Sequence, residues 1–252
     1  MYIPVVKEVL PFFLGSLVLF GLLGLIFRRS QWKRTAWACF ILGMIAACYM
    51  LYFFRDPQRI SPSDPAVIVA GADGVVMSVK EVREDAYLKT DAVRISIFLT
   101  LFDVHVNRAP IAGKIAFLGY FPGKRYFTFQ EKSSEFNQHN SILIEGPQTR
   151  CLVNQIVGPV ARRVVYWLKL NQVVQKGDRI GMMKFGSRLD MVFPKADVDV
   201  VVKPGDRVQA GLTVVAPPDP DHNATDLVAR RQRSEVGGQG SVSYGRPIRL
   251  PF

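Results

Sequence analysis

The stretch Val174-Gln-Lys-Gly-Asp-Arg-Ile-Gly181 has the pattern of a short strand, a Gly-Asp turn and a second strand. A second stretch, Val202-Lys-Pro-Gly-Asp-Arg-Val-Gln-Ala-Gly211, has the same pattern. Glycine and aspartate favour tight turns, while the β-branched residues around them favour strands. This part of the chain is therefore predicted to consist of short β-hairpins.

The same pattern extends over residues 60–216, which we expect to form one domain. Short β-branched runs such as Val93–Leu99 and Asp197–Val202 alternate with turn residues such as Asp73-Gly74. Many short strands at this spacing predict a mainly β (β-rich α+β), barrel-sandwich-like domain. One helix is expected after Phe102.

Two long apolar runs precede this domain, at residues 9–27 and 35–54. At about 1.5 Å per residue, each helix would be long enough to cross a hydrocarbon core about 30 Å thick. Residues 1–59 are therefore predicted to be a membrane-associated helical hairpin. A cleaved signal peptide fits poorly, because Arg28-Arg29 follows the first run instead of small residues. If the two helices instead formed a buried core hairpin, a domain of modest size would have to cover their almost entirely apolar surfaces.

The expected location is the cell membrane, in a bacterium the inner membrane, with the β-rich domain at the cytoplasmic face. Four cations lie between the apolar runs and favour a cytoplasmic loop. A hairpin that spans the membrane with this loop in the cytoplasm would place the β-rich domain on the opposite side. A shallow hairpin that enters only one leaflet would keep the loop and the domain in the cytoplasm. Both topologies stay open at this stage.

The formal net charge of +11 fits an anionic membrane surface, given the apolar runs, and we expect no nucleic acid partner. Three cysteines without a C-x-x-C pair and three histidines predict no metal site.

Residues 217–252 lose hydrophobic periodicity and are expected to form a flexible basic tail.

The window Phe185-Gly-Ser-Arg-Leu-Asp190 places a Gly-Ser pair between two apolar runs. It resembles the processing site of the short bacterial and archaeal phosphatidylserine decarboxylases. Further segments resemble the same family in the same order: Phe53-Phe-Arg-Asp-Pro57, Ala70-Gly-Ala-Asp-Gly74, Phe102-Asp-Val-His-Val-Asn-Arg-Ala-Pro110, Gly119-Tyr-Phe-Pro-Gly-Lys124, Asn140-Ser-Ile142 and Gln155-Ile-Val-Gly158. The segment Glu135-Phe-Asn-Gln-His139 departs from the family pattern.

The resemblance implies a chain that cleaves itself between Gly186 and Ser187. The Ser187 hydroxyl would attack the preceding carbonyl, and elimination and hydrolysis would leave a pyruvoyl group at residue 187. This covalent cofactor would accept electrons while phosphatidylserine loses carbon dioxide and becomes phosphatidylethanolamine. The cleaved β and α subunits would remain together as a heterodimer, or as a dimer of such heterodimers.

Serine is a weak nucleophile and needs a base with an orienting partner. We predict that Ser187, His105 and Asp73 form this catalytic set, while Gly186 permits the strained geometry of attack. Asp103 is a rival orienting carboxylate, because on a strand it would share a face with His105 and on a helix it would not. His139 is a weaker candidate for the base, and His222, in the tail, is expected to be inert.

Four cations are candidates for binding the headgroup phosphodiester: Lys124, Arg162, Arg163 and Arg188. A rival hypothesis is a non-catalytic, membrane-tethered barrel-sandwich module, since similar hairpins occur in biotinyl and lipoyl carriers. That module would need neither Gly186-Ser187 nor His105. A third hypothesis is a decarboxylase of another serine phospholipid.

Overall fold

The chain forms two compact units, residues 1–58 and 59–252, in a computed structural model. The structure describes residues 5–29, 32–124, 126–128, 130, 133–159, 164–184 and 187–217. The predicted tail, residues 217–252, lies outside the described part from residue 218 onward, and so does His222.

The first unit is an antiparallel hairpin of two helices, α1 (Leu10–Arg29) and α2 (Lys33–Phe53), preceded by a short 3-10 helix η1 (Lys7–Val9). The helices pack closely at glycines. A Cβ on Gly24 would lie 2.7 Å from the ring of Phe40, and one on Gly43 would lie 2.7 Å from Cβ of Phe20. The absence of side chains at these positions therefore permits the contact between the helices.

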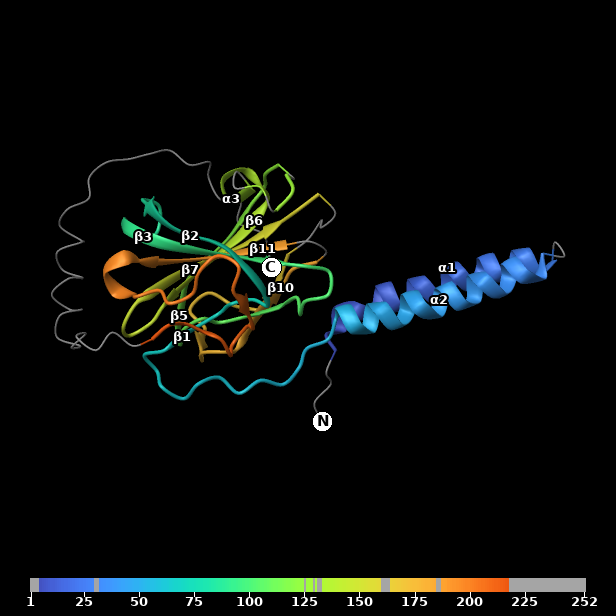
Figure 1. The fold of residues 1–252 in the computed structure, drawn as a ribbon, viewed down its shortest axis with the longest axis horizontal. Coiled ribbons are helices and arrows are strands. Elements are labelled where there is room, and N and C mark those ends of the chain that lie inside the picture. Colours follow the sequence, from blue (N-terminus) through green and yellow to red (C-terminus); the bar gives the residue numbers. More distant parts are fainter. Residues whose placement is uncertain are drawn as a thin grey trace. The chain divides into compact units, whose positions relative to one another are not determined.

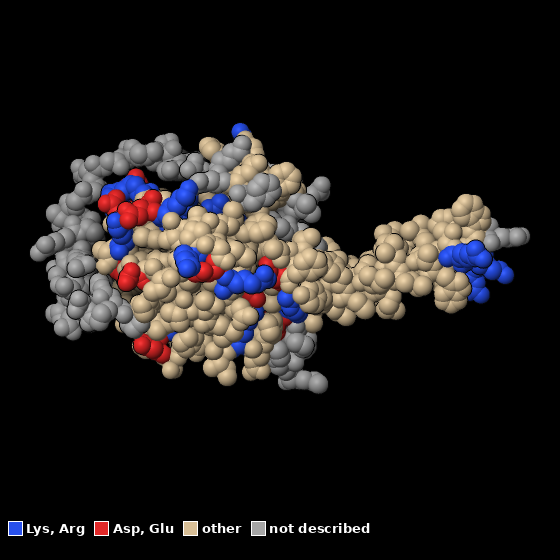
Figure 2. All heavy atoms as spheres, in the orientation of Figure 1, with Lys and Arg blue, Asp and Glu red and all other residues tan. Residues whose placement is uncertain are grey.

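Both helices are long and apolar enough to cross a membrane by length and composition, with mean hydropathies of 2.5 and 1.9. Figure 2 shows Lys and Arg side chains gathered at one end of the hairpin, where α1 ends in Arg28 and Arg29 and α2 begins with Lys33 and Arg34. The rest of the hairpin surface in this view is uncharged. The predicted apolar helical hairpin is confirmed.

The second unit is rich in strands. Its strands are β1 (Ile68–Val69), β2 (Gly74–Glu84), β3 (Thr90–Leu99), β4 (Val106–Arg108), β5 (Gly113–Phe121), β6 (His139–Glu145), β7 (Arg150–Val157), β8 (Val165–Tyr166), β9 (Val173–Val174), β10 (Arg179–Met182), β11 (Ser187–Pro194), β12 (Arg207–Val208) and β13 (Val214–Ala216). A four-residue helix α3 (Ser133–Phe136) and a 3-10 helix η2 (Lys195–Asp197) complete it.

Eight strands form one curled antiparallel sheet in the order β12-β2-β3-β11-β7-β6-β5-β9, visible in Figure 1. Two smaller sheets, β4-β10-β8 and β1-β13, complete the strand-rich unit. One apolar core joins residues from all three sheets, among them Ile97, Leu189 and Ile180 with Ile68 and Val215. The predicted β-rich, barrel-sandwich-like body is confirmed.

Two local predictions differ from the structure. No helix follows Phe102 in the described chain, because the Asp103 carboxylate accepts hydrogen bonds from the amide and hydroxyl of Thr100 at 2.8 and 2.7 Å. This side-chain cap makes a tight turn instead. The expected strand at Asp197–Val202 is replaced by η2 and extended chain, although the Val201 amide still donates to the Val215 carbonyl.

Candidate functional site

Ser187 is the first residue of β11, the strand at the centre of the large sheet. It lies opposite Leu99 on β3 and opposite Val157 on β7. Ser187 is fully buried, and its Oγ makes no hydrogen bond with any described residue. Buried hydroxyls nearly always have a partner, so this unpartnered hydroxyl is an exception that marks Ser187 as a candidate functional residue.

Two backbone connections place His105 in the same part of the fold as Ser187. The loop that carries His105 begins after Leu99, the residue opposite Ser187. The His105 carbonyl then accepts a hydrogen bond at 3.3 Å from the amide of Met183, four residues before Ser187. The structure therefore brings the two predicted residues into one region of the fold.

The His105 ring is fully buried, and its Nδ1 lies 3.0 Å from the carbonyl oxygen of Asp103. A carbonyl can only accept, so Nδ1 carries the proton and donates it. In the neutral ring the lone pair is then on Nε2, which is the tautomer that a general base requires.

Asp73 lies in the turn before β2 and is held by a buried ion pair. Arg59 donates to both carboxylate oxygens at 2.5 and 2.8 Å, and the Ala210 amide donates at 2.8 Å. Gly74, the next residue, has φ of +147°, and a Cβ there would lie 2.0 Å from the Phe98 carbonyl oxygen. The Asp-Gly turn is thus fixed both by its carboxylate and by close backbone approach.

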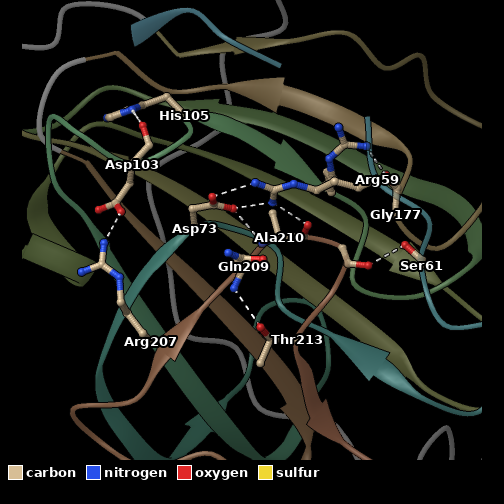
Figure 3. Close-up of polar contacts among 12 residues, drawn as sticks. Arg59, Ser61, Asp73, Asp103, His105, Gly177, Arg207, Gln209, Ala210 and Thr213 are labelled. Carbon is tan, nitrogen blue, oxygen red and sulfur yellow. Dashed lines mark hydrogen bonds and ion pairs between the residues drawn. The ribbon is translucent and has the colours of Figure 1, made fainter. Parts of the chain in front are cut away.

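Figure 3 shows the Asp73 carboxylate directed toward Arg59, while the His105 ring lies against the backbone of Asp103. The described partners of the Asp73 carboxylate are Arg59 and Ala210, not His105. The Asp103 carboxylate bonds Thr100 and receives a hydrogen bond from Arg207 at 2.9 Å. The orienting role of Asp73 stays a prediction, as does that of its rival Asp103.

The candidate headgroup cations lie in different settings. Lys124 is exposed, with its Nζ 5.7 Å from the ring centre of Tyr126. Arg188 is 1% exposed and donates to Asp190 at 2.7 Å, to Ser96 at 2.6 Å and to the Gln130 carbonyl at 3.5 Å. Arg162, Arg163 and Gly186 lie outside the described residues.

His139 lies on β6 and stacks on Phe121, with ring centres 4.9 Å apart. Burial lowers the pKa of this imidazole below its usual value, although a hydrogen bond to the Asn137 carbonyl and the charge of Asp190 oppose the shift. Its side chain points to the face of the sheet opposite Ser187, so it is not placed to act as the base.

Three residues near the predicted site were not singled out by the sequence reasoning. Arg59 lies two residues after the Phe53–Pro57 segment, and it neutralises Asp73. Asn107 and Gln155 form a buried hydrogen bond at 2.7 Å between two sheets. Asn107 lies two residues after His105, in the same family-like segment, and this position is the sequence feature that could have identified it as a candidate. The contact with Gln155 joins residues 48 positions apart, and no local pattern predicts it.

Comparison with known proteins gives a consistent result. A family model described as phosphatidylserine decarboxylase matches residues 47–216. The phosphatidylserine decarboxylase proenzyme of Carboxydothermus hydrogenoformans is 45% identical over 175 residues, covering 69% of this chain and 82% of that protein. The proenzyme of Desulfotalea psychrophila is 36% identical over 214 residues, covering 84% and 96%. That of Symbiobacterium thermophilum is 38% identical over 204 residues, covering 81% and 91%.

Proposed function

Because the chain belongs to the phosphatidylserine decarboxylase family, whose members are carboxy-lyases, we propose that it is a self-cleaving, pyruvoyl-dependent enzyme acting on phosphatidylserine. Its product would be phosphatidylethanolamine, a step of phospholipid biosynthesis. The observation that carries the proposal is Ser187, a fully buried serine at the head of β11 whose hydroxyl has no described partner.

In the proposed self-cleavage, Ser187 Oγ attacks the carbonyl of Gly186 and gives its proton to His105. The Nδ1–H of His105, held by the Asp103 carbonyl, leaves Nε2 as the basic nitrogen. β11 is paired on both sides, so the segment after the cleaved bond remains anchored when the chain is broken. This supports two subunits that stay associated.

A pyruvoyl group formed from Ser187 supplies a carbonyl that condenses with a primary amine and withdraws electrons as carbon dioxide leaves. The chain's own residues would bind and orient the substrate around residue 187. Burial of Ser187 and His105 excludes water from that position. His105 is proposed to return a proton to the substrate carbon.

The membrane hairpin fits this substrate. A diacyl lipid remains in the bilayer, so an enzyme acting on its headgroup benefits from two helices long and apolar enough to enter that bilayer. We propose attachment to the cell membrane with the catalytic unit at the cytoplasmic face. Lys124, Arg162 and Arg163 remain candidate phosphodiester ligands in this proposal, whereas the buried donors of Arg188 bond Asp190, Gln130 and Ser96 within the protein.

The test is to purify the full chain in detergent and measure the masses of its fragments. The proposal expects residues 1–186 and 187–252, with a pyruvoyl group beginning the second, and labelled carbon dioxide from carboxyl-labelled phosphatidylserine. Ser187→Ala should give one intact, inactive chain. An unbroken wild-type chain without activity would instead support a non-catalytic membrane-tethered module. Activity only on another serine phospholipid would revise the substrate.

The third member of the catalytic set is tested by comparing Asp73→Asn with Asp103→Asn. Each carboxylate pairs with an arginine, but the Arg59 side chain is buried whereas that of Arg207 is 72% exposed, so the unfolding free energy of both variants is measured beside their cleavage rates. We propose Asp73, and we expect its amide variant to slow cleavage more. A larger effect at Asp103 would transfer the orienting role to that residue.

A further inference from the structure

Three buried amide side chains lie on the strands around Ser187: Gln155 on the neighbouring strand β7, Asn140 on β6 beyond it, and Asn107 on β4 of the smaller sheet. Asn107, Asn140 and Gln155 have exposed fractions of 0%, 2% and 0%. Asn107 Nδ2, Asn140 Nδ2 and Gln155 Oε1 are buried and make no hydrogen bond with any described residue. Since buried polar atoms are almost always satisfied, three such atoms near the buried Ser187 hydroxyl indicate that another molecule supplies their partners.

The strand register places two of these amides on the Ser187 side of the large sheet. Gln155 lies opposite Leu189 on one side and opposite Asn140 on the other, and Ser187 lies opposite Val157. Side chains alternate along a strand, so Ser187, Gln155 and Asn140 project to the same face. Gln155 is diagonal to Ser187, a separation of about 7–8 Å that a long side chain can bridge.

Asn107 reaches this group from the smaller sheet. Its Oδ1 accepts a hydrogen bond from Gln155 Nε2 at 2.7 Å. Gly181, opposite Asn107 on β10, has no side chain, and a Cβ there would lie 3.0 Å from Gln155 Nε2 and 2.4 Å from the Val165 carbonyl oxygen. Gly181 therefore leaves the space in which the two amides meet.

His105 precedes Asn107 by two positions, and its backbone continues the β4–β10 pairing through the Met183 amide. Residues two apart along an extended chain project to the same side. His105 and Asn107 from one sheet, and Ser187 and Gln155 from the other, are therefore directed into a single polar region.

The amide pair offers one donor and one acceptor. In the observed orientation these are Asn107 Nδ2 and Gln155 Oε1. If both amides were turned over, the hydrogen bond between them would be kept and the roles would merely exchange. Asn140 Nδ2 adds a donor. Two donors and one acceptor match a group that carries both a carboxylate and an amine nitrogen.

The neutrality of these side chains suits decarboxylation. A cation would hold an ionised carboxylate more strongly than the uncharged carbon dioxide that leaves it. Such binding stabilises the ground state more than the transition state and slows the reaction. Amides orient a carboxylate by the direction of their N–H groups and hold it more weakly than an ion pair does, because the amide donor carries no net charge.

We propose that Asn107, Asn140 and Gln155 form the subsite that binds the amino-acid end of the substrate headgroup, and that this subsite distinguishes a serine headgroup from an ethanolamine headgroup. The proposal rests on the proposed function, because it assigns a role to the surroundings of residue 187.

The test uses full-length Asn107→Leu and Gln155→Met, which keep the side-chain volume and remove the polar atoms. Cleavage is measured first by fragment mass, and KM and kcat are then measured with short-chain phosphatidylserine. Binding is measured by calorimetry after borohydride reduction of the processed enzyme, with short-chain phosphatidylserine and phosphatidylethanolamine compared. Asn107→Leu removes a donor to the carboxylate that the ethanolamine lipid lacks, and Gln155→Met releases Asn107 from the hydrogen bond that orients this donor, so each variant should lose about tenfold of the preference for the serine lipid, the effect of one hydrogen bond.

The matched control is Asn154→Leu. Asn154 precedes Gln155 on the same strand but points to the opposite face, where its Oδ1 accepts a hydrogen bond from Ser141 at 2.7 Å. This variant should keep the wild-type preference between the two lipids. Asn154 is half-buried, and the stability of this variant provides the comparison for losing a hydrogen-bonded amide on the same strand.

An unchanged lipid preference in Asn107→Leu and Gln155→Met, with the wild type cleaved and active, would overturn the subsite and leave the proposed function standing. The amides would then bind a structural water only. A loss of affinity that is equal for both lipids would also overturn it, because a general structural defect does not discriminate between headgroups. Failure of the proposed function is recognised separately, by an uncleaved and inactive wild type.

Discussion

The two faces of strand β11 differ in how their polar groups are satisfied. On one face, Ser187 precedes the core residues Leu189 and Met191, and its hydroxyl has no described partner. On the other face, Arg188 and Asp190 are 1% exposed and bond each other at 2.7 Å. Alternation along one strand thus separates a reactive position from a structural one.

The Arg188 face is a connected network. Arg188 also donates to Ser96 on β3, and Asp190 accepts from Ser134 of α3 at 2.6 Å. These bonds join the central strand to its neighbour and to the segment that covers it. We interpret Arg188 as a positioning residue for β11, since its described donors all have partners within the protein.

The difference between the faces predicts that substitutions near Ser187 alter chemistry, while substitutions on the other face alter stability. The largest effect is expected for His105→Ala, which should slow self-cleavage by about 10²–10⁴-fold, the usual contribution of a positioned base. Pulse-chase electrophoresis of the two fragments measures this rate. His139→Phe, a histidine on the other face, is the control and should cleave at the wild-type rate. Normal cleavage in His105→Ala would exclude His105 as the base.

The next effect is on stability. Arg188→Met should lower the free energy of unfolding by about 3–5 kcal/mol, because it removes the closer cation of the buried Asp190 carboxylate and leaves Arg94 at 4.0 Å. Urea unfolding of the full chain in detergent measures this loss. Ser187→Ala, the adjacent position on the other face, is compared with Ser187 in an uncleaved His105→Ala background, where it should change stability by no more than about 0.5 kcal/mol, since its hydroxyl has no described partner to lose. Equal losses in both variants would contradict the distinction between the faces.

A smaller loss is expected for Ser96→Ala. Its hydroxyl accepts a hydrogen bond from the Arg188 guanidinium at 2.6 Å, and a bond to a charged group contributes about 1.5–3 kcal/mol. Ser78→Ala tests the residue paired with Ser96 on β2, whose hydroxyl has no hydrogen bond among the described residues. That control should remain within about 0.5 kcal/mol of the wild type.

The smallest effect concerns pH. Burial lowers the pKa of His139, so the folded chain favours the neutral ring more than the unfolded chain does. The resulting stability is fully present above the unfolded pKa of 6.5 and is lost as pH falls from there through the lower folded pKa. His139→Phe should therefore flatten the decrease in unfolding free energy between pH 7 and pH 5. An unchanged slope in urea titrations at those pH values would refute this role.

Much of the fold was predictable because it depends on local patterns. The apolar lengths of α1 and α2 and the Gly-Asp turns at Gly177 and Gly205, with φ of +85° and +98°, follow directly from residue type. The helix expected after Phe102 failed because the Asp103 side chain caps its own backbone, and this competes with helix formation.

The sequence by itself determined the apolar hairpin, the β-rich body and the identity of Ser187 and His105 as candidates, since periodicity and residue chemistry are properties of neighbouring residues. Only the tertiary structure decided that Asp73 pairs with Arg59, that Asn107 meets Gln155, and that Arg188 faces away from the Ser187 side. These contacts depend on strand register and on how the sheets pack together. A shift of one residue in register would reverse every side chain on β11.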